Sequence, residues 1–191
     1  MSQRPLLELH DVPLPECREL PSRLVSVAIS PGLTAITGGE RTGKTGLLRI
    51  ISQGAATSSD QKYHHETLGL DSSLPGHDHA SPREVWASIA TPQWDEDLQA
   101  FLIHAWEMAP HIDKALSMLS KGHRRKVGLL AALCSNHTIT CIDMPYAALD
   151  MRSIGVLRAH LREVARDTTR AWVIADYEAD EHLEWAQTIR L

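Results

Sequence analysis

The sequence predicts an α/β protein with a mainly parallel sheet, because segments of strand and helix character alternate along the chain. The predicted strands are short runs rich in β-branched and apolar residues, at 6–9, 24–29, 33–37, 138–142 and 171–175. The predicted helices have a capping residue or apolar residues at helical spacing, at 47–51, 82–89, 95–108, 120–133 and 153–164. We expect a single domain, 1–191, with a helical insert at about 82–122.

Length and composition are those of an ordinary globular domain. The chain has 191 residues, 43% of them hydrophobic and 23% charged, and a formal net charge of −5. Nucleic acid is not an expected partner, because its binding usually requires a basic surface. Three cysteines without a CxxC pair predict a reducing compartment. The longest apolar run, 127–134, is too short to span a membrane, so we expect a cytoplasmic chain that reaches a membrane only through a partner.

A glycine-rich loop follows the predicted strand at 33–37. Residues 38–45, GGERTGKT, match the pattern G-x-x-x-x-G-K-[ST], with a strand before them and an apolar helix after them. In such a loop the backbone N–H groups surround phosphates, the lysine reaches the β- and γ-phosphates, and the last hydroxyl binds Mg²⁺. The pattern therefore predicts a site for ATP and Mg²⁺. The predicted nucleotide-binding residues are Gly38, Gly39, Glu40, Arg41, Thr42, Gly43, Lys44, Thr45 and Gly46.

A second motif lies in residues 119–150, LSKGHRRKVGLLAALCSNHTITCIDMPYAALD. Ser120 and the backbone of Gly122 at a helix N-terminus form a potential anion-binding site, and Asp143 ends a buried strand, where a Mg²⁺ ligand belongs. The segment resembles, without a gap, the stretch of ABC transporter ATP-binding subunits from the LSGGQ signature through the Walker B strand to the D-loop. The resemblance places the signature on Ser120, Lys121, Gly122 and His123.

Together with the glycine loop, this resemblance covers nearly the whole chain. It implies a P-loop NTPase core of ABC ATPase type, with an N-terminal antiparallel β region in addition to the parallel sheet and the insert. It also implies that ATP holds two such chains together, the signature of one closing over the nucleotide of the other. The expected partners are a membrane permease, at the inner face of the cell membrane, and a second ATP-binding chain.

Two departures from the family's pattern concern hydrolysis. Met144 stands where the family has the glutamate that polarises the attacking water, and Tyr177 stands at the switch histidine. A thioether cannot accept the proton, and loss of a general base typically slows a reaction by about 10²–10⁴-fold. We therefore predict impaired hydrolysis, with Asp176 or Glu178 as weak candidates for a substitute base.

Other departures concern Mg²⁺ and the adenine. A Mg²⁺-sensing glutamine is missing, and Asp71 is the best positional match, beside Thr45 and Asp143, as a metal ligand. No Phe, Trp or Tyr precedes Tyr63, so an adenine would have to stack on His10 or Arg18. Inside the loop, Arg41 replaces a glycine and Gly46 replaces a hydroxyl residue of the family's pattern.

Two functions fit these observations. The first is the ATP-binding subunit of an exporter, similar to the ATPase of the haem exporter of cytochrome c maturation or to those of ABC-2 type permeases. The second is a pseudo-ATPase that senses nucleotide and regulates a partner. An unrelated P-loop kinase or GTPase is disfavoured, because no N-K-x-D motif is present. The missing base favours pairing with a complete ABC ATPase over a homodimer.

Three further features have both a functional and a structural interpretation. His64-His65 and His77-Asp78-His79 bracket a polar loop, but solvated histidines are a commoner explanation than zinc. The basic start of the helix after Ser120 (Lys121, Arg124, Arg125 and Lys126) is expected to be a solvated face. Trp86, Trp94 and Trp106 are expected to pack the helical insert, and part of that surface to contact a membrane subunit.

Overall fold

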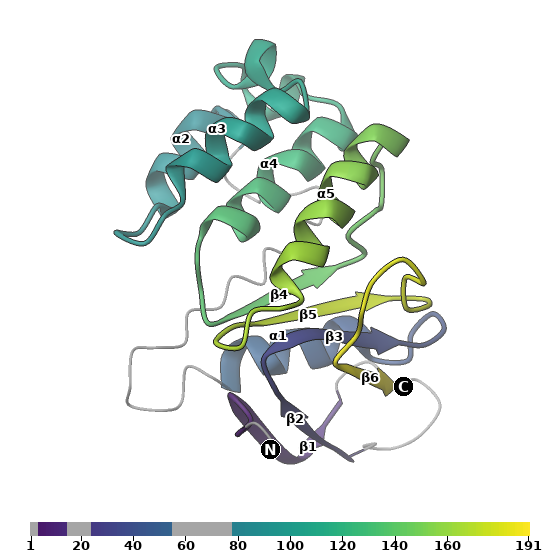
Figure 1. Ribbon diagram of the computed structural model, residues 1–191. Coiled ribbons are helices and arrows are strands. Elements are labelled where there is room, and N and C mark those ends of the chain that lie inside the picture. Colours follow the sequence, from purple (N-terminus) through teal and green to yellow (C-terminus); the bar gives the residue numbers. More distant parts are fainter. Residues whose placement is uncertain (1–3, 15–23, 55–77) are drawn as a thin grey trace. The chain divides into compact units, whose positions relative to one another are not determined.

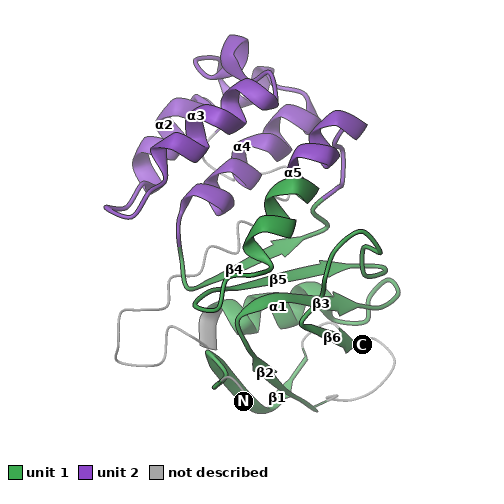
Figure 2. Cartoon of the chain, viewed as in Figure 1, with its two compact units in different colours: residues 1–67, 137–145, 158–191 green, residues 68–136, 146–157 purple. Residues whose placement is uncertain are grey.

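The computed structural model describes residues 4–14, 24–54 and 78–191. The chain divides into two compact units, coloured separately in Figure 2. The first unit comprises residues 1–67, 137–145 and 158–191, and contains the sheets. The second comprises residues 68–136 and 146–157, and is helical.

A four-stranded sheet, with the strand order β4–β5–β3–β6, forms the centre of the first unit (Figure 1). Its neighbouring strands are all parallel. The parallel arrangement brings the carboxyl ends of the strands to one edge, where Thr37 is the register partner of Asp176 and Asp143 that of Ala175. The strands are β3 (Gly32–Thr37), β4 (Ile139–Asp143), β5 (Ala171–Asp176) and β6 (Gln187–Arg190).

The N-terminal strands form a separate antiparallel pair. β1 (Leu7–Pro13) pairs with β2 (Leu24–Ile29), and the register shifts between Leu9 and Val12. On β2, Val27 and Ile29 are buried and the residue between them is exposed. Because side chains of a strand alternate between its two faces, only one face of this pair is buried. The predicted N-terminal antiparallel region is thus confirmed.

Helix α1 (Lys44–Gly54) follows β3 and packs against β4 and β5. Leu47, Leu48 and Ile51 are fully buried on its inner side. They meet alternate residues of the sheet, among them Cys141 and Val173, in one hydrophobic core. The core fixes the first turn of α1, and with it the glycine loop, against the end of β3.

The second unit consists of helices, and side chains cap the N-termini of α2, α3 and α4. It contains α2 (Pro82–Ile89), α3 (Glu96–Ala105), α4 (Lys121–Cys134) and the short helices η2 (Ala109–His111) and η3 (Leu116–Met118). Helix α5 (Met151–Val164) begins in this unit and ends in the first. The capping residues of α2, α3 and α4 are Ser81, Asp95 and Ser120.

The tryptophans pack this unit as expected. Trp86 is 2% exposed and donates from Nε1 to the carbonyl of Val127, and Trp106 is 1% exposed and donates to the carbonyl of Ser153. Trp94 is half-buried and donates a hydrogen bond from Nε1 to Oε1 of Gln99. The indole N–H groups thereby tie α2 and the end of α3 to the backbone of α4 and α5.

Two element predictions were wrong in detail. The helix predicted through Met108 ends at Ala105, because the backbone becomes left-handed at Glu107, with φ 55°. No strand was predicted after β5, yet residues 187–190 form β6, whose exposed and half-buried residues alternate. The helical insert predicted at about 82–122 lies inside the second unit, and the single-domain assignment stays a prediction.

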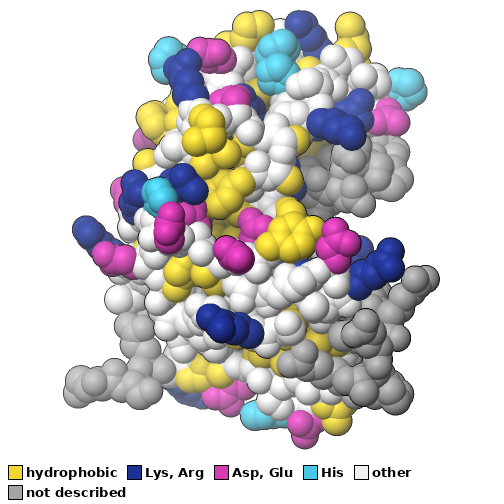
Figure 3. Space-filling view, turned by 90° about the vertical axis from the view of Figure 1, so that its right-hand side faces the viewer, with side chains coloured by type: hydrophobic (Ala, Val, Ile, Leu, Met, Phe, Trp, Pro, Cys, Tyr) yellow, Lys and Arg dark blue, Asp and Glu magenta, His cyan; other side chains and the backbone are white. Residues whose placement is uncertain are grey.

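The surface in Figure 3 shows basic and acidic side chains interspersed, with hydrophobic side chains among them. None of the helices in the described part of the chain has the length and apolar character needed to cross a membrane.

Candidate nucleotide-binding site

The glycine loop connects the buried strand β3 directly to α1. Gly43 has φ 96°, a left-handed conformation that favours glycine, and a Cβ there would lie 3.2 Å from Leu14 Cδ1 and displace that side chain slightly. A Cβ on Gly38 would lie 2.7 Å from Thr42 Oγ1 and 2.8 Å from the carbonyl oxygen of Leu191. Arg41, which replaces a family glycine, also adopts a left-handed conformation, with φ 59°.

Lys44 is held inside this loop. It is 9% exposed, and its Nζ donates to the carbonyls of Gly38 at 2.7 Å and Gly39 at 2.6 Å. The ring of Tyr177 lies against the same ammonium, 4.9 Å from Nζ to the ring centroid. The charge therefore lies beside the backbone that the motif assigns to phosphate binding.

Thr45 and Asp143 come together although they are far apart in sequence. Thr45 Oγ1 donates to Asp143 Oδ2 at 2.6 Å. Both are oxygen ligands of the kind that Mg²⁺ prefers, at the N-terminus of α1 and the end of β4. The third predicted metal ligand, Asp71, lies outside the described residues, as do Arg18, His64, His65 and His77.

The remaining loop residues make contacts within the loop or with Tyr177. Glu40 is exposed, and its Oε1 accepts a hydrogen bond from the Tyr177 hydroxyl at 3.4 Å. Thr42 donates to the carbonyl of Gly39, and Gly46 is buried in the first turn of α1. His10, a predicted adenine partner, is an exposed residue of β1 with Nε2 3.9 Å from Glu8 Oε2. Among the described residues, no cluster of three potential metal ligands of the His, Cys, Asp and Glu types occurs.

Met144 and Tyr177, the two positions that depart from the family's pattern, lie beside Asp143 and the glycine loop. Met144 directly follows Asp143, has φ 48°, and donates from its backbone N–H to the carbonyl of Ala175. Tyr177 directly follows β5, and its carbonyl accepts a hydrogen bond from the N–H of Gly38 at 3.3 Å. Met144 thus lies next to Asp143, and the ring of Tyr177 lies against Lys44. The thioether of Met144 cannot accept a proton.

Asp176 is the carboxylate at the end of β5. Burial raises its pKa above the ordinary aspartate value, and a hydrogen bond from the N–H of Tyr177 opposes that rise. Glu178, the other candidate base, lies on the wall of the pocket described next.

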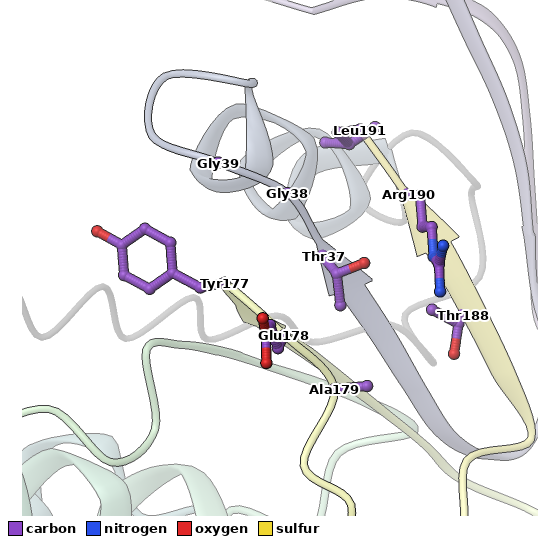
Figure 4. A pocket seen from close by; sticks show the side chains of 9 residues that line it. All are labelled: Thr37, Gly38, Gly39, Tyr177, Glu178, Ala179, Thr188, Arg190 and Leu191. Atoms are coloured by element: carbon purple, nitrogen blue, oxygen red, sulfur yellow. The ribbon is translucent and has the colours of Figure 1, made fainter.

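An open pocket of about 530 Å³ adjoins the loop at the carboxyl ends of β3, β5 and β6 (Figure 4). Tyr177 follows β5 and Arg190 belongs to β6, so the two lie on opposite sides of the end of β3. The sequence did not predict this wall, because β6 was missed; the alternation in QTIR was its only signal. The lining residues are Thr37, Gly38, Gly39, Tyr177, Glu178, Ala179, Thr188, Arg190 and Leu191.

The predicted signature residues lie in the second unit, at the start of α4. Ser120 caps the helix and accepts from the N–H of His123 at 3.2 Å. Lys121 is exposed, whereas Gly122 lies so close to the 148–150 segment that a Cβ would be 2.7 Å from the carbonyl oxygen of Ala148. The signature is therefore packed directly on the predicted D-loop.

The start of α4 is not the solvated basic face that was expected. Arg125 is 9% and Lys126 7% exposed. Lys126 Nζ donates to Asp150 Oδ2 at 3.1 Å and to the carbonyl of Trp106 at 3.3 Å. Hydrogen bonds from Ser153 and Lys126 hold the pKa of Asp150 well below its usual range. Lys126 thus fastens α4 to the D-loop.

Asp150→Ala should therefore destabilise the fold by about 1–3 kcal/mol, because it leaves a buried ammonium without its carboxylate. The loss is smaller than for a fully buried pair, since the Asp150 side chain is 59% exposed. Because the pKa of Asp150 is lowered in the fold, its contribution is complete above about pH 4 and is lost as the pH falls further. Urea unfolding followed by tryptophan fluorescence measures the effect.

Asp113→Ala is the matched control. Asp113 pairs with Arg83 at 2.7 Å, but both side chains are more than 60% exposed, so little stability should be lost. Equal unfolding midpoints for the two variants would contradict a structural role of the Lys126–Asp150 pair.

The sequence was compared with known proteins. No protein-family model matches it. The chain is 26% identical over 179 residues to the molybdenum import ATP-binding protein ModC of Hahella chejuensis, which covers 84% of this chain and 50% of that protein. It is also 26% identical over 210 residues to the aliphatic sulfonates import ATP-binding protein SsuB of Granulibacter bethesdensis. That alignment covers 99% of this chain and 80% of that protein. The chain thus spans about half the length of the first relative.

Solved structures show the same fold. An ABC transporter ATP-binding protein from Pyrococcus furiosus superposes with a TM-score of 0.72 at 19% identity, covering 96% of both chains. An ATP-binding subunit of an ABC transporter gives a TM-score of 0.65 at 14% identity, covering 88% of this chain and 78% of the other. The structure of a protein named RNase-L Inhibitor superposes with a TM-score of 0.58 at 16% identity, covering 78% of this chain and 35% of the other.

These comparisons confirm the predicted ABC ATPase fold and the resemblance to ATP-binding subunits of ABC transporters. Both curated relatives carry import in their names, whereas the sequence resemblance indicated export. The low identities agree with the departures at Met144 and Tyr177.

Proposed function

We propose that this chain, which has the fold of ABC ATPases and is homologous to ATP-binding subunits of ABC transporters, binds ATP with Mg²⁺ at its glycine loop and serves a membrane permease. The observation that carries the proposal is the hydrogen bond from Thr45 to Asp143 at the end of the parallel sheet, next to a lysine, Lys44, that is held by the loop carbonyls. A lysine, a hydroxyl and a carboxylate are the three side chains that phosphate and its metal require.

The residues present fit ATP and Mg²⁺. Thr45 and Asp143 would hold the metal, which when bound neutralises negative charge on the phosphates. The backbone N–H groups from Gly39 to Thr45 and the N-terminus of α1 would bind the phosphate oxygens. Lys44 would exchange its two carbonyl acceptors for phosphate oxygens, and the face of Tyr177 would stay beside it.

We further propose that hydrolysis is slow. Met144 follows the metal-binding aspartate without a group that can accept a proton, and Tyr177 offers a hydroxyl instead of an imidazole. The half-buried Asp176 has a raised pKa, so it would hold a proton more readily than an ordinary aspartate. Its Oδ1 is nevertheless engaged by the backbone of the next residue, accepting from the N–H of Tyr177 at 2.8 Å.

The proposed assembly is a dimer closed by ATP. In a heterodimer with a complete ABC ATPase, the signature of this chain would serve the partner's intact site, while the site with Met144 would hold ATP without cleaving it. In a homodimer, both sites would lack the base. The permease would place the dimer at the inner face of the cell membrane. The direction of transport stays a prediction: the sequence resemblance favours export, and the names of the relatives favour import.

A second function, a nucleotide-sensing regulator without transport, is favoured by the same two residues. The structural neighbour named RNase-L Inhibitor is in keeping with the occurrence of this fold in proteins whose names do not mention transport. Transport is distinguished from regulation by the partner, because only the first requires a membrane protein that co-purifies with the chain.

The test of the proposed function is a pair of assays on the purified chain. Isothermal titration with MgATP should show one site per chain, and phosphate release should stay near the uncatalysed background. Binding of ATP that does not depend on Mg²⁺ would contradict the role of Thr45 and Asp143. Rapid turnover by the chain alone would contradict the proposed loss of hydrolysis.

A further inference from the structure

The pocket beside the glycine loop lies on the face of the sheet that α1 does not cover (Figure 4). Ile36 of β3 and Ile189 of β6 belong to the hydrophobic core on the α1 side. Thr37 and Arg190 follow these two isoleucines and are register partners of each other. Because side chains alternate along a strand, Thr37 and Arg190 point to the opposite face.

This pocket is distinct from the site proposed for ATP and Mg²⁺. The side chains assigned there to the phosphates and the metal, those of Lys44, Thr45 and Asp143, are described residues outside the lining of the pocket. The two sites meet at Gly38, whose N–H donates to the carbonyl of Tyr177 at 3.3 Å. A molecule in the pocket would therefore contact the start of the glycine loop without taking the place of the phosphates.

Two opposite charges lie on opposite walls of the pocket. Glu178 follows β5 and Arg190 belongs to β6, and Thr37 at the end of β3 lies between them. Both charged side chains are exposed, and among the residues that the structure describes neither has a hydrogen-bond or ion-pair partner. Neighbouring strands are about 4.8 Å apart, so β5 and β6, with β3 between them, are roughly 10 Å apart. The two charges are therefore placed to pair with a ligand that spans the end of β3.

The chemistry of the walls selects a ligand with one anionic and one cationic end. A guanidinium donates two parallel hydrogen bonds to a carboxylate, and a carboxylate accepts from an ammonium. In a free amino acid both groups sit on one carbon, whereas the ends of an extended dipeptide are about 7 Å apart. The hydroxyls of Thr37 and Thr188 offer partners for the peptide group. The volume of about 530 Å³ suits a small molecule of this size.

We propose that this pocket binds a zwitterionic dipeptide, with the carboxylate of the ligand on Arg190 and its ammonium on Glu178. The inference goes beyond the proposed function, because it gives the chain a second small-molecule ligand besides ATP. Binding should weaken as the salt concentration rises, since both charged walls are exposed to solvent.

The first experiment titrates the isotope-labelled full chain with alanylalanine, without nucleotide, and follows its backbone amides by NMR. The amide signals of Gly38, Gly39 and Ala179 should shift and saturate, whereas that of Arg166, outside the pocket, should stay in place. N-acetylated alanylalanine lacks the ammonium and alanylalanine amide lacks the carboxylate, so each should bind at least about threefold more weakly. Equal affinities for the three compounds, or shifts that do not saturate, would overturn the proposal.

The second experiment assigns each end of the ligand to its wall. Arg190→Gln should abolish the preference for alanylalanine over its amide, and Glu178→Gln the preference over the acetylated form. Arg166→Gln, which replaces an exposed arginine outside the pocket, should keep both preferences. Retention of both preferences in Arg190→Gln and Glu178→Gln would contradict the assignment. A variant that fails to fold would bind none of the compounds, and the comparison of the three compounds on the wild-type chain then decides.

Neither measurement requires nucleotide, so the two functions are tested separately. A chain that binds MgATP but not alanylalanine overturns this inference and leaves the proposed function standing. A chain that binds alanylalanine with both preferences but does not bind MgATP supports the dipeptide site and refutes the proposed function.

Discussion

Replacing Lys44 with alanine should lower the affinity for MgATP by about 10- to 150-fold, because each hydrogen bond to a charged group contributes about 1.5–3 kcal/mol. The ammonium is already placed in the loop by Gly38, Gly39 and the Tyr177 ring, so little ordering is required when it meets a phosphate. Titration with a fluorescent ATP analogue measures the loss.

Arg166→Ala is the control for this change. Arg166 is an exposed cation of the same compact unit and lies outside the glycine loop, so its removal tests for a general effect of charge. Its affinity should equal that of the wild type. If Lys44→Ala also binds MgATP with wild-type affinity, the loop is not the nucleotide site.

Met144→Glu should raise the rate of ATP hydrolysis by at least about 10²-fold, the lower part of the range for a general base. The lower part applies because Tyr177 still occupies the switch position. The backbone of Met144 is fixed by its hydrogen bond to Ala175 and directly follows Asp143, so a glutamate would enter at the proper place. Phosphate release per chain, measured at saturating MgATP, tests the change.

Met144→Gln separates the proton acceptor from the shape of the side chain. Gln, Glu and Met are all unbranched at Cβ, so the left-handed conformation at φ 48° costs each about the same. The glutamine variant should remain as slow as the wild type. A rate increase shared by both variants would show that Met144 obstructs the site sterically rather than lacking a base.

The sequence predicted those parts of the site that depend on spacing along the chain. GGERTGKT between a strand and a helix was enough to place Lys44, and the end of a parallel strand was enough to bring Asp143 to Thr45. Parallel strands place their carboxyl ends at a common edge, so both predictions require only that the strands are correctly identified. Ser120 as the cap of α4 follows from equally local chemistry.

The rest depends on contacts that spacing does not determine. His111 meets His123 through a short helix and a turn whose path the sequence does not specify. The burial of Lys126 depends on a carboxylate 24 residues further on. β6 is a four-residue strand whose position beside β3 is set by the sheet, and the pocket wall with Arg190 was missed with it.

The contact between α4 and the segment that ends at Asp150 affects how mutations in this chain should be interpreted. Lys126 forms a hydrogen bond with Asp150 in that segment. Because Gly122 has no side chain, the backbone of Ala148 can also lie close to the start of α4. A substitution in either segment is therefore expected to change the conformation of both. Reduced ATP-driven assembly in a variant at Asp150 would not identify a residue that touches the nucleotide until the geometry around Ser120 had been measured independently.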